Sequence, residues 1–370
     1  MSAEPASPST RTAAALAAFF HPRAVAVVGA PRDPAGIGHR ILLALQGSRF
    51  SGTIFPVNPH AADVAGLKAF PSLTAVPGPV DLAVIAVPPP LVLSVIDECA
   101  AAHVPAVVLI TAGFAETGGA GRSLEQQLAD KVRRHGIRLI GPNCFGLMNL
   151  DPAVRLNATY TPAIPPAGRV AIASESGGLG LAVVTAAQRL NLGLSGFVSV
   201  GNHVDVSVLD LLEYWEQDDA TGVILLYLET VADPRRFRQV AGRVGTKKPI
   251  VALKAGRTQA GQSAAGSHTA ALATNDIAVD ALFAQCGVIR AKTLEELLAL
   301  ATGLSSQPLP QGRRIGILTN SGGPGVLCAD SCAAQGLTLP ELSKQTQSAL
   351  ASFLPSTAAL RNPVDVIGFA

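Results

Sequence analysis

The chain has 370 residues with a formal net charge of +2, and 48% of its residues are hydrophobic but only 4% are aromatic. Such an apolar chain can bury two or three domain cores, while its near-neutral charge and few aromatic residues argue against a nucleic-acid partner. No apolar run reaches the ~18 residues of a membrane span, so we expect no membrane partner. No signal-peptide pattern is present and the five cysteines form no CxxC pair, so we expect a cytoplasmic protein.

After an N-terminal tail that we place at residues 1–19, residues 20–145 alternate short apolar strands with helices. The expected strands lie near residues 25–29, 53–57, 82–87, 107–110 and 138–140. Continuous apolar strands separated by helices form parallel sheets that are covered on both faces, so this segment predicts a Rossmann-type α/β domain. Ligands bind such sheets outside the carboxyl ends of the strands, where this chain has turns rich in glycine and proline.

These turns supply candidate residues for a nucleotide-like ligand. Gly29 follows the first strand and lets the backbone approach a pyrophosphate, but the spacing is not GxGxxG, so NAD is a poor fit. Asn143 follows the fifth strand and is placed to hydrogen-bond a substrate carbonyl or thioester; a rigid turn at the domain exit is the alternative. Cys144 has no base tied to it by sequence, so a nucleophilic role for its thiol is the minor hypothesis.

A second alternating series predicts a doubly wound α/β domain at residues 146–305, which opens with a Pro-rich linker at 146–165. Its strands are expected near residues 170–174, 195–200, 222–228 and 249–254. A third series, residues 306–370, has one clear strand, one helix and a short strand near 364–366. This series is too short for a doubly wound sheet, so we expect a domain cut partway or completed by another chain.

One pattern occurs twice: an apolar strand, a turn of hydroxyl residues and glycines, and then a helix. The two copies are SESGGLG at residues 174–180 and TNSGGPG at residues 319–325. The unpaired N–H groups and the dipole of a helix N-terminus favour anions, so each turn suits a phosphate. The candidate phosphate ligands are Ser174, Ser176, Gly177 and Gly178 in the first copy and Asn320, Ser321, Gly322 and Gly323 in the second.

A histidine between the two copies, His268, lies in a run of small residues at 261–273. A neutral imidazole is a good nucleophile near neutral pH, and covalent catalysis divides one difficult transfer into two easier ones. Two anion-binding turns and one histidine indicate a phosphoryl group that passes through the protein. Glu229, which follows the strand at 222–228, is placed to orient the imidazole or hold its proton. A surface or core histidine and a capping acid are the alternatives for these two residues.

Taken together, the motifs resemble the NDP-forming acyl-CoA synthetases, which include ADP-forming acetyl-CoA synthetase and succinyl-CoA synthetase. The matching stretches occur in family order: AVAVVGAPRDPAGIG, FPVNP, DLAVIAVPPP, ITAGFAE, RLIGPNCFGLMN, RVAIASESGGLG, FVSVGNHVDV, LLYLET, KAGRTQAGQSAAGSHTAALA, GVIRAKTLEELL and RRIGILTNSGGPGV. The resemblance implies a CoA-binding domain, a flavodoxin-like ligase domain that carries a phosphohistidine, and the incomplete start of a second ligase domain.

The resemblance also implies roles for individual residues. It implies that His268 is the phosphorylated histidine, that Glu229 assists it, and that the two turns hold its phosphate. It places the contacts to CoA or its thioester at Gly29, Ala30, Pro31, Val57, Pro88, Ala112 and Asn143. Two departures stand out: Ala270 would stiffen the loop where the family often has glycine, and the charge of Glu175 would oppose a phosphate.

The implied reaction interconverts acyl-CoA, phosphate and ADP with a carboxylic acid, CoA and ATP, through an acyl phosphate and a phosphohistidine at His268. The ATP-grasp domain of the family, which binds ATP or ADP with Mg²⁺, is absent from this sequence. We therefore expect it on a further domain or a separate subunit, with its loss as the third alternative, and we expect an oligomer with no metal site in this chain. The acid itself is not identified by the sequence.

Two other functions remain open. Some relatives with this architecture belong to protein lysine acyltransferases that have lost the histidine, so the presence of His268 favours the synthetase. A non-catalytic CoA-binding regulator would bind CoA without forming a phosphohistidine. A dehydrogenase fits least, because the turn at Gly29 departs from the dinucleotide fingerprint and the second anion-binding turn would have no use.

Overall fold

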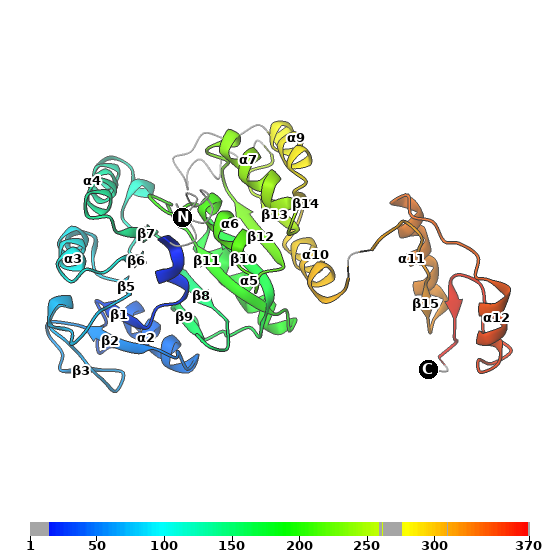
Figure 1. Cartoon of the computed structure of the whole chain (residues 1–370), viewed down its shortest axis with the longest axis horizontal. Coiled ribbons are helices and arrows are strands. Elements are labelled where there is room, and N and C mark those ends of the chain that lie inside the picture. The colour runs from blue at the N-terminus through cyan, green and yellow to red at the C-terminus, as the bar shows by residue number, and fades with distance from the viewer. Residues whose placement is uncertain (1–14, 259–260, 262–275, 309, 369–370) are drawn as a thin grey trace, which may run out of the picture. The chain divides into compact units, whose positions relative to one another are not determined.

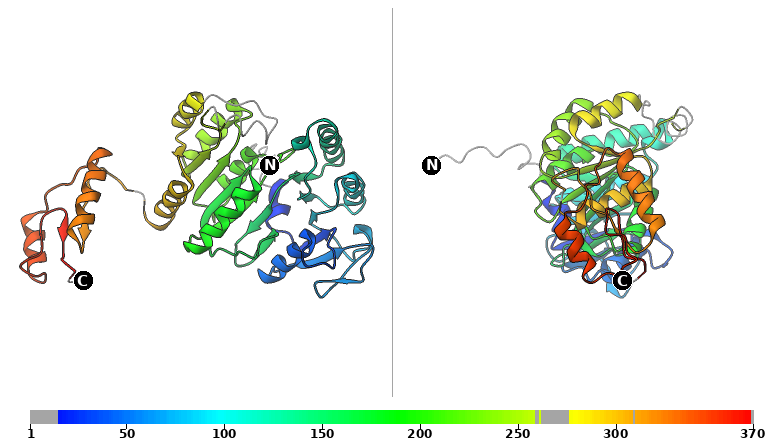
Figure 2. Two further views of the ribbon diagram at one scale, coloured as in Figure 1. Left: turned by 180° about the vertical axis from the view of Figure 1, so that it is seen from behind. Right: turned by 90° about the vertical axis from the view of Figure 1, so that its right-hand side faces the viewer.

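The structure is a computed structural model that describes residues 15–258, 261, 276–308 and 310–368. The chain divides into two compact units, and the boundary between them in the sequence falls between Gln307 and Pro308. The first unit contains two sheets that lie side by side, as both Figure 1 and Figure 2 show. Within the described ranges, none of the helices combines the length and the apolar character that a membrane span requires.

The first sheet has five parallel strands in the order β2-β1-β5-β6-β7. The strands are β1 (Ala24–Val28), β2 (Thr53–Val57), β5 (Leu82–Ile85), β6 (Ala106–Leu109) and β7 (Arg138–Ile140), and the helices are α2 (Ile37–Gly47), α3 (Pro89–Ala101) and α4 (Gly119–His135). Val25 and Val27 belong to the core cluster that includes α2, whereas Ala26 and Val28 pack with α3 and α4. Helices therefore cover both faces, and the predicted Rossmann-type sheet is confirmed.

The connections between the strands of this sheet contain further short elements. They are the hairpin β3 (Asp63–Val64) and β4 (Leu67–Lys68) and the 3₁₀ turns η1 (Leu73–Ala75) and η2 (Ala115–Thr117). Residues 15–20 are helical, and Leu16 and Phe19 are completely buried. The predicted tail at 1–19 is therefore wrong from residue 15 onward, because these two apolar side chains belong to the core.

The second sheet has seven strands in the order β14-β13-β12-β10-β11-β8-β9. Its strands are β8 (Gly146–Asn149), β9 (Leu156–Thr159), β10 (Ala167–Ser174), β11 (Leu194–Ser199), β12 (Val223–Leu228), β13 (Ile250–Lys254) and β14 (Ile289–Ala291). Its helices are α5 (Gly177–Arg189), α6 (Val208–Gln217), α7 (Pro234–Gly245), α9 (Asp276–Cys286) and α10 (Leu294–Ser306). The core clusters place α6, α7 and α9 on one face and α5 and α10 on the other, as a doubly wound sheet requires.

The segment 146–165, predicted to be a linker, instead supplies the antiparallel strands β8 and β9 at one edge of this sheet. Leu147 and Leu156 are completely buried and join the same core cluster as Val27 of β1. The linker prediction is wrong because polar residues on these strands are also buried and hydrogen-bonded; for example, the amide of Asn149 donates to the carbonyl of Phe20 at 2.7 Å. The two sheets thus share one continuous core.

The second unit is small. Its elements are β15 (Leu318–Thr319), α11 (Gly322–Ala334), α12 (Lys344–Ala351) and β16 (Val364–Asp365). Strands β15 and β16 pair in parallel, which confirms the short strand predicted near 364–366. The strand predicted before the turn at 319–325 is shorter than expected, because the preceding N–H groups of Ile315 and Ile317 donate to Thr338 and to the side chain of Asn362.

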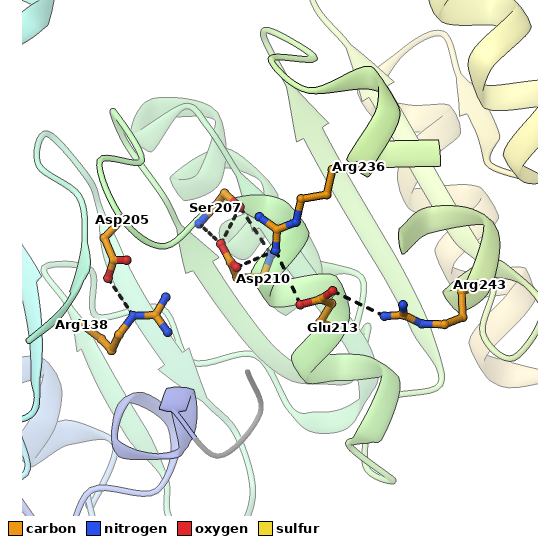
Figure 3. Close-up of polar contacts among 7 residues, drawn as sticks. All are labelled: Arg138, Asp205, Ser207, Asp210, Glu213, Arg236 and Arg243. Carbon is orange, nitrogen blue, oxygen red and sulfur yellow. Dashed lines mark hydrogen bonds and ion pairs between the residues drawn. The ribbon is translucent and has the colours of Figure 1, made fainter. Parts of the chain in front are cut away.

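An ion cluster joins α6 to α7 in the first unit (Figure 3). Ser207 and Asp210 form a capping box at the start of α6, and Arg236 of α7 donates to Asp210 at 2.8 Å. Arg236 also lies 3.5 Å from Glu213, which in turn lies 3.6 Å from Arg243. Burial alone would raise the pKa of Asp210, but hydrogen bonds from Arg236 and Ser207 outweigh it and hold the pKa below its ordinary 3.8.

Because the pKa of Asp210 is lower in the folded protein, its stabilising contribution is complete above the ordinary pKa and disappears as the pH falls through the lowered value. We expect Asp210→Asn to lower the free energy of unfolding by about 1–3 kcal/mol at pH 7 and to flatten its decline in acid. Urea unfolding from pH 7 to pH 2 measures both effects. The control is Asp130→Asn, whose exposed ion pair with Arg133 contributes about 0–1 kcal/mol. Equal acid dependence in wild type and Asp210→Asn would contradict the prediction.

Candidate functional site

A cavity of about 1270 Å³ lies where the carboxyl ends of strands from both sheets meet. The first sheet contributes residues that follow β5, β6 and β7, and the second sheet contributes residues that follow β10, β11 and β12. Among the predicted site residues, those lining the cavity are Pro88, Ala112, Asn143, Ser176, Gly177, Gly178 and Glu229. The structure therefore brings part of the predicted CoA contacts together with the first anion-binding turn and its carboxylate.

The first anion-binding turn connects β10 to α5. Ser176 is the N-cap of α5, and its side chain accepts a hydrogen bond from the backbone N–H of Leu179 at 3.4 Å. Gly177 and Gly178 form the first turn of the helix, whose N–H groups have no partner within a helix. A side chain at Gly178 would meet open space, so this end of α5 faces the cavity. Its geometry suits an oxyanion or a phosphate.

Ser174 has a different place from the one predicted. Its side chain is buried and does not line the cavity. Its hydroxyl donates to the carbonyl of Ser176 at 2.7 Å and accepts from the N–H of the same residue at 3.2 Å. Ser174 therefore shapes the turn rather than offering its hydroxyl to a ligand.

Glu175 does not point its carboxylate at the turn that contains it. The carboxylate instead accepts hydrogen bonds from the backbone N–H groups of Glu229 at 2.6 Å and Thr230 at 3.0 Å. Burial raises the pKa of Glu175, while the charge of His203 and these hydrogen bonds act in the opposite direction. The expected repulsion between Glu175 and a phosphate is thus reduced, and the residue holds the segment that carries Glu229.

Glu229 lines the cavity directly after β12, as the sequence predicted for a carboxylate at that strand end. Lys254 ends the neighbouring strand β13 and is only 4% exposed. Burial lowers the pKa of the Lys254 ammonium group, while the charges of Glu175, Asp276 and Glu229 act to raise it. A buried cation therefore partly balances the two glutamates at this edge.

The remaining predicted CoA contacts lie at the same edge of the first sheet but outside the lining of the cavity. They are Gly29, Ala30, Pro31 and Val57. Gly29 has a φ of +84°, and its N–H donates to the carbonyl of Val57 at 3.1 Å. A Cβ on Gly38 would lie 2.5 Å from the carbonyl oxygen of Gly29, so α2 starts in close contact with this turn. A glycine turn beside a helix N-terminus fits a pyrophosphate, as CoA contains.

The second anion-binding turn, which lies in the second unit, shares a pair of hydrogen bonds with the first turn. The hydroxyl of Thr319 donates to the carbonyl of Ser321 at 2.8 Å and accepts from its N–H at 3.1 Å. Ser321 is the N-cap of α11, which begins at Gly322. The repeat in sequence therefore extends to this pair of hydrogen bonds, in which Thr319 corresponds to Ser174, whereas the side chain of Ser321 makes no cap hydrogen bond like that of Ser176. Asn320, Ser321, Gly322 and Gly323 occupy this turn as predicted, but their contact with phosphate stays a prediction.

Two further predicted residues have contrasting outcomes. His268 lies outside the described residues, so its role stays a prediction. Cys144 is buried at the end of the first sheet, and burial raises the pKa of its thiol to about 12. The thiol donates to the carbonyl of Leu109 at 3.3 Å. The thiolate is the reactive form of cysteine, so the structure argues against Cys144 as a nucleophile.

Sequence reasoning missed several polar residues of the cavity. They are Glu116, Glu125, Asn202 and His203. Asn202 and His203 directly follow the strand predicted at 195–200, within the stretch FVSVGNHVDV. Their position after a buried strand was the available signal, because that edge of a parallel sheet is where ligands bind.

Three family models match the chain in succession. They describe a CoA binding domain at residues 23–149, a succinyl-CoA ligase like flavodoxin domain at residues 167–304 and a Ligase-CoA domain at residues 315–370. The first two matches correspond to the two sheets of the first unit, and the third to the second unit.

Individual proteins match nearly the whole chain. The alpha subunit of ADP-forming acetate–CoA ligase II of Pyrococcus furiosus is 44% identical over 352 residues, which are 95% of this chain and 76% of that subunit. The ADP-forming acetate–CoA ligase of Methanocaldococcus jannaschii is 43% identical over 350 residues, 95% of this chain but only 49% of that protein. The structure of the dinucleotide forming acetyl-coenzyme A synthetase 1 of Ca. Korarchaeum cryptofilum with phosphate and ADP superposes with a TM-score of 0.90, at 42% identity, over 96% of this chain and 76% of that one.

Proposed function

Because the chain belongs to the family of ADP-forming acyl-CoA ligases, we propose that it interconverts acyl-CoA, phosphate and ADP with a carboxylic acid, CoA and ATP. The family resemblance predicted from the motifs is confirmed. The relatives reported above are CoA ligases or CoA synthetases by name, and the acyltransferase and the non-catalytic regulator find no support among them.

One observation carries the proposal: the first anion-binding turn, Glu229 and three of the predicted CoA contacts, Pro88, Ala112 and Asn143, line a single cavity. A phosphate at the N-terminus of α5 would lie in the same cavity as a thioester beside Asn143. An oxygen of the phosphate attacks the thioester carbonyl, the C–S bond breaks, and CoA leaves as the thiol. The product is an acyl phosphate, and the partial positive charge of the helix N-terminus stabilises the phosphate throughout.

The second step moves the phosphoryl group to His268. A ring nitrogen of His268 attacks phosphorus, the bond from phosphorus to the acyl oxygen breaks, and the carboxylate leaves. Glu229 accepts a hydrogen bond from the other ring N–H and stabilises the charge that develops on the imidazole. In the third step an oxygen of ADP attacks phosphorus, the N–P bond breaks, and ATP forms.

The nucleotide requires a further part of the enzyme. We propose that an ATP-grasp domain or subunit binds ADP or ATP with Mg²⁺ and assembles with this chain. One relative is named as an alpha subunit, and the chain spans about three quarters of that subunit and about half of the M. jannaschii protein. We also propose that the second turn, at Asn320–Gly323, holds the phosphohistidine in a different position from the first.

The experiment that tests this function leaves the nucleotide out. The chain and the full-length gene product are incubated with ³²P-phosphate and a series of acyl-CoAs. We expect protein-bound label that is labile in acid and stable in base, and none when acyl-CoA is omitted. The acyl-CoA that labels fastest indicates the substrate. A full-length protein that binds CoA but takes up no label with any acyl-CoA would overturn the proposed function.

A further inference from the structure

Residues 200–207, here called the bridging loop, connect β11 to α6 and run along the end of β7. Their backbone N–H groups donate to carbonyls of the first sheet: Asn202 to Pro142 at 2.9 Å, Val204 to Gly141 at 3.2 Å and Val206 to Leu139 at 3.0 Å. Asp205 accepts from Arg138 at 2.9 Å, which Figure 3 shows. The bridging loop therefore forms backbone hydrogen bonds along β7, the edge strand of the first sheet, and the turn after it.

The loop lies very close to the first sheet at one point. Gly201 has a φ of +56°, and a Cβ there would lie 2.1 Å from the carbonyl oxygen of Pro142. Only glycine fits this approach without a backbone shift. The next residue, Asn202, is thereby brought into the lining of the cavity.

The side chain of Asn202 uses its whole amide across the boundary between the two sheets. Its nitrogen donates to the carboxylates of Glu116 at 2.6 Å and Glu125 at 2.7 Å. Its oxygen accepts from the side-chain amide of Asn143 at 3.3 Å. Two N–H groups and one oxygen thus hold Glu116 of η2, Glu125 of α4 and Asn143 of the loop after β7, all of which line the cavity.

The two carboxylates in turn hold the loop that follows β6. Glu116 accepts from the N–H groups of Gly113 at 2.5 Å and Phe114 at 3.1 Å, and Glu125 accepts from Ala115 at 3.2 Å. Burial alone would raise the pKa of Glu116, but these hydrogen bonds and that from Asn202 lower it. The carboxylate is therefore ionised at neutral pH and needs a donor on the side that Asn202 occupies.

We propose that Asn202 is a positioning residue, which fixes the loop at 112–118 and the Asn143 amide so that they hold the CoA thioester for attack. The inference rests on the proposed function and deepens it, because it assigns the shape of the thioester site to a residue of the other sheet. Asn202 does so through two donated hydrogen bonds and one accepted one, and it takes no part in the transfer from acyl phosphate to histidine.

Asn202→Asp is the sharpest test, because it keeps the shape of the side chain and removes both donors. The new carboxylate would face two others, and like charges at this distance repel. Adding Glu116→Gln to the same chain restores one bond with its direction reversed. The amide nitrogen introduced at position 116 donates to the carboxylate introduced at position 202, while the amide oxygen still accepts from Gly113 and Phe114. The double variant therefore tests whether a restored hydrogen bond between positions 116 and 202 also restores CoA affinity.

Two reactions and one binding measurement distinguish the outcomes. We expect Asn202→Asp to weaken CoA binding, measured by calorimetry, by at least about tenfold. Labelling from acyl-CoA and ³²P-phosphate should fall by at least the same factor at low acyl-CoA, whereas labelling from ³²P-acyl phosphate should stay within about twofold. The double variant, which combines Asn202→Asp with Glu116→Gln, should recover part of the affinity that Asn202→Asp loses, because the carboxylate of Glu125 still faces the one introduced at position 202.

The matched control is Arg138→Gln, which loosens the other end of the bridging loop and leaves Asn202 in place. It should leave CoA affinity within about twofold, because Asp205 still accepts a hydrogen bond from the backbone N–H of Leu139 at 2.8 Å and keeps the loop in place. Unchanged CoA affinity in Asn202→Asp, equal losses with acyl-CoA and acyl phosphate, or no recovery in the double variant would each overturn the inference. Failure of wild type to be labelled by acyl phosphate would instead remove the proposed function.

Discussion

Phosphoenzyme should fall to background when His268 is replaced with asparagine. The asparagine amide resembles one edge of the imidazole in size, but its nitrogen lone pair is delocalised into the carbonyl and does not attack phosphorus. Labelling from acyl-CoA and ³²P-phosphate, and equally from ³²P-acyl phosphate, should therefore disappear. CoA binding should stay within about twofold of wild type, because the cavity beside Asn143 is unchanged.

The control is His135→Asn on α4, where the ring lies 3.7 Å from Asp97 and a third of the side chain is exposed. That variant should label as wild type does. Acid-labile label that persists in His268→Asn would show that another residue carries the phosphoryl group. Formation of free acyl phosphate by His268→Asn would in turn isolate the first step, which the histidine does not perform.

Glu229→Gln should slow phosphohistidine formation by about 10²–10⁴-fold, the usual contribution of a positioned proton acceptor. Glutamine keeps the shape of the side chain and removes its charge. The backbone N–H of residue 229 remains held by Glu175 at 2.6 Å, so the segment should stay in place. The loss should therefore appear in the rate constant and leave the affinity for acyl-CoA nearly unchanged.

Rapid quenching after mixing with ³²P-acyl phosphate measures that rate constant. Glu98→Gln is the matched control, because Glu98 lies on α3 and accepts a hydrogen bond from the N–H of Leu73, away from the cavity. It should react at the wild-type rate. A rate within about threefold of wild type for Glu229→Gln would contradict a proton-holding role for this carboxylate.

Much of the fold follows from the sequence because the strands of parallel sheets are buried on both faces. Val25–Val28 and Leu82–Ile85 are continuous apolar runs, and both form strands where predicted. Strands β8 and β9 escaped prediction because they carry Asn149, Asn157 and Thr159 into the core. Hydrogen bonds satisfy these side chains there: Asn149 donates to the distant carbonyl of Phe20, and Thr159 donates to Asn157. A polar residue interrupts the apolar pattern of a strand, and the sequence then predicts a loop when the hydrogen-bond partner of that residue lies far along the chain.

The site could be predicted in part, because the turns that follow the strands of one parallel sheet lie together at one edge of that sheet. Ser176, Glu229 and Asn143 could be placed on edges, and the structure puts all three around one cavity. The contact of Asn202 with Glu116 depends on how two separate sheets are set against each other, which no periodicity encodes. The redirection of Glu175 onto the backbone of residue 229 is hidden for another reason, because it depends on the pairing of β10 with β12, which are not consecutive in the sequence.

The shared core of the first unit has a consequence for how the protein responds to its substrates. Apolar residues of β1 and α2 belong to the same cluster as those of β12 and α7, so neither sheet can open alone without exposing the other. The two sheets should melt as one cooperative body. A substrate that contacts only the first sheet, present at a hundred times its Kd, would then protect the second sheet by the same ~2.7 kcal/mol that it confers on its own binding site.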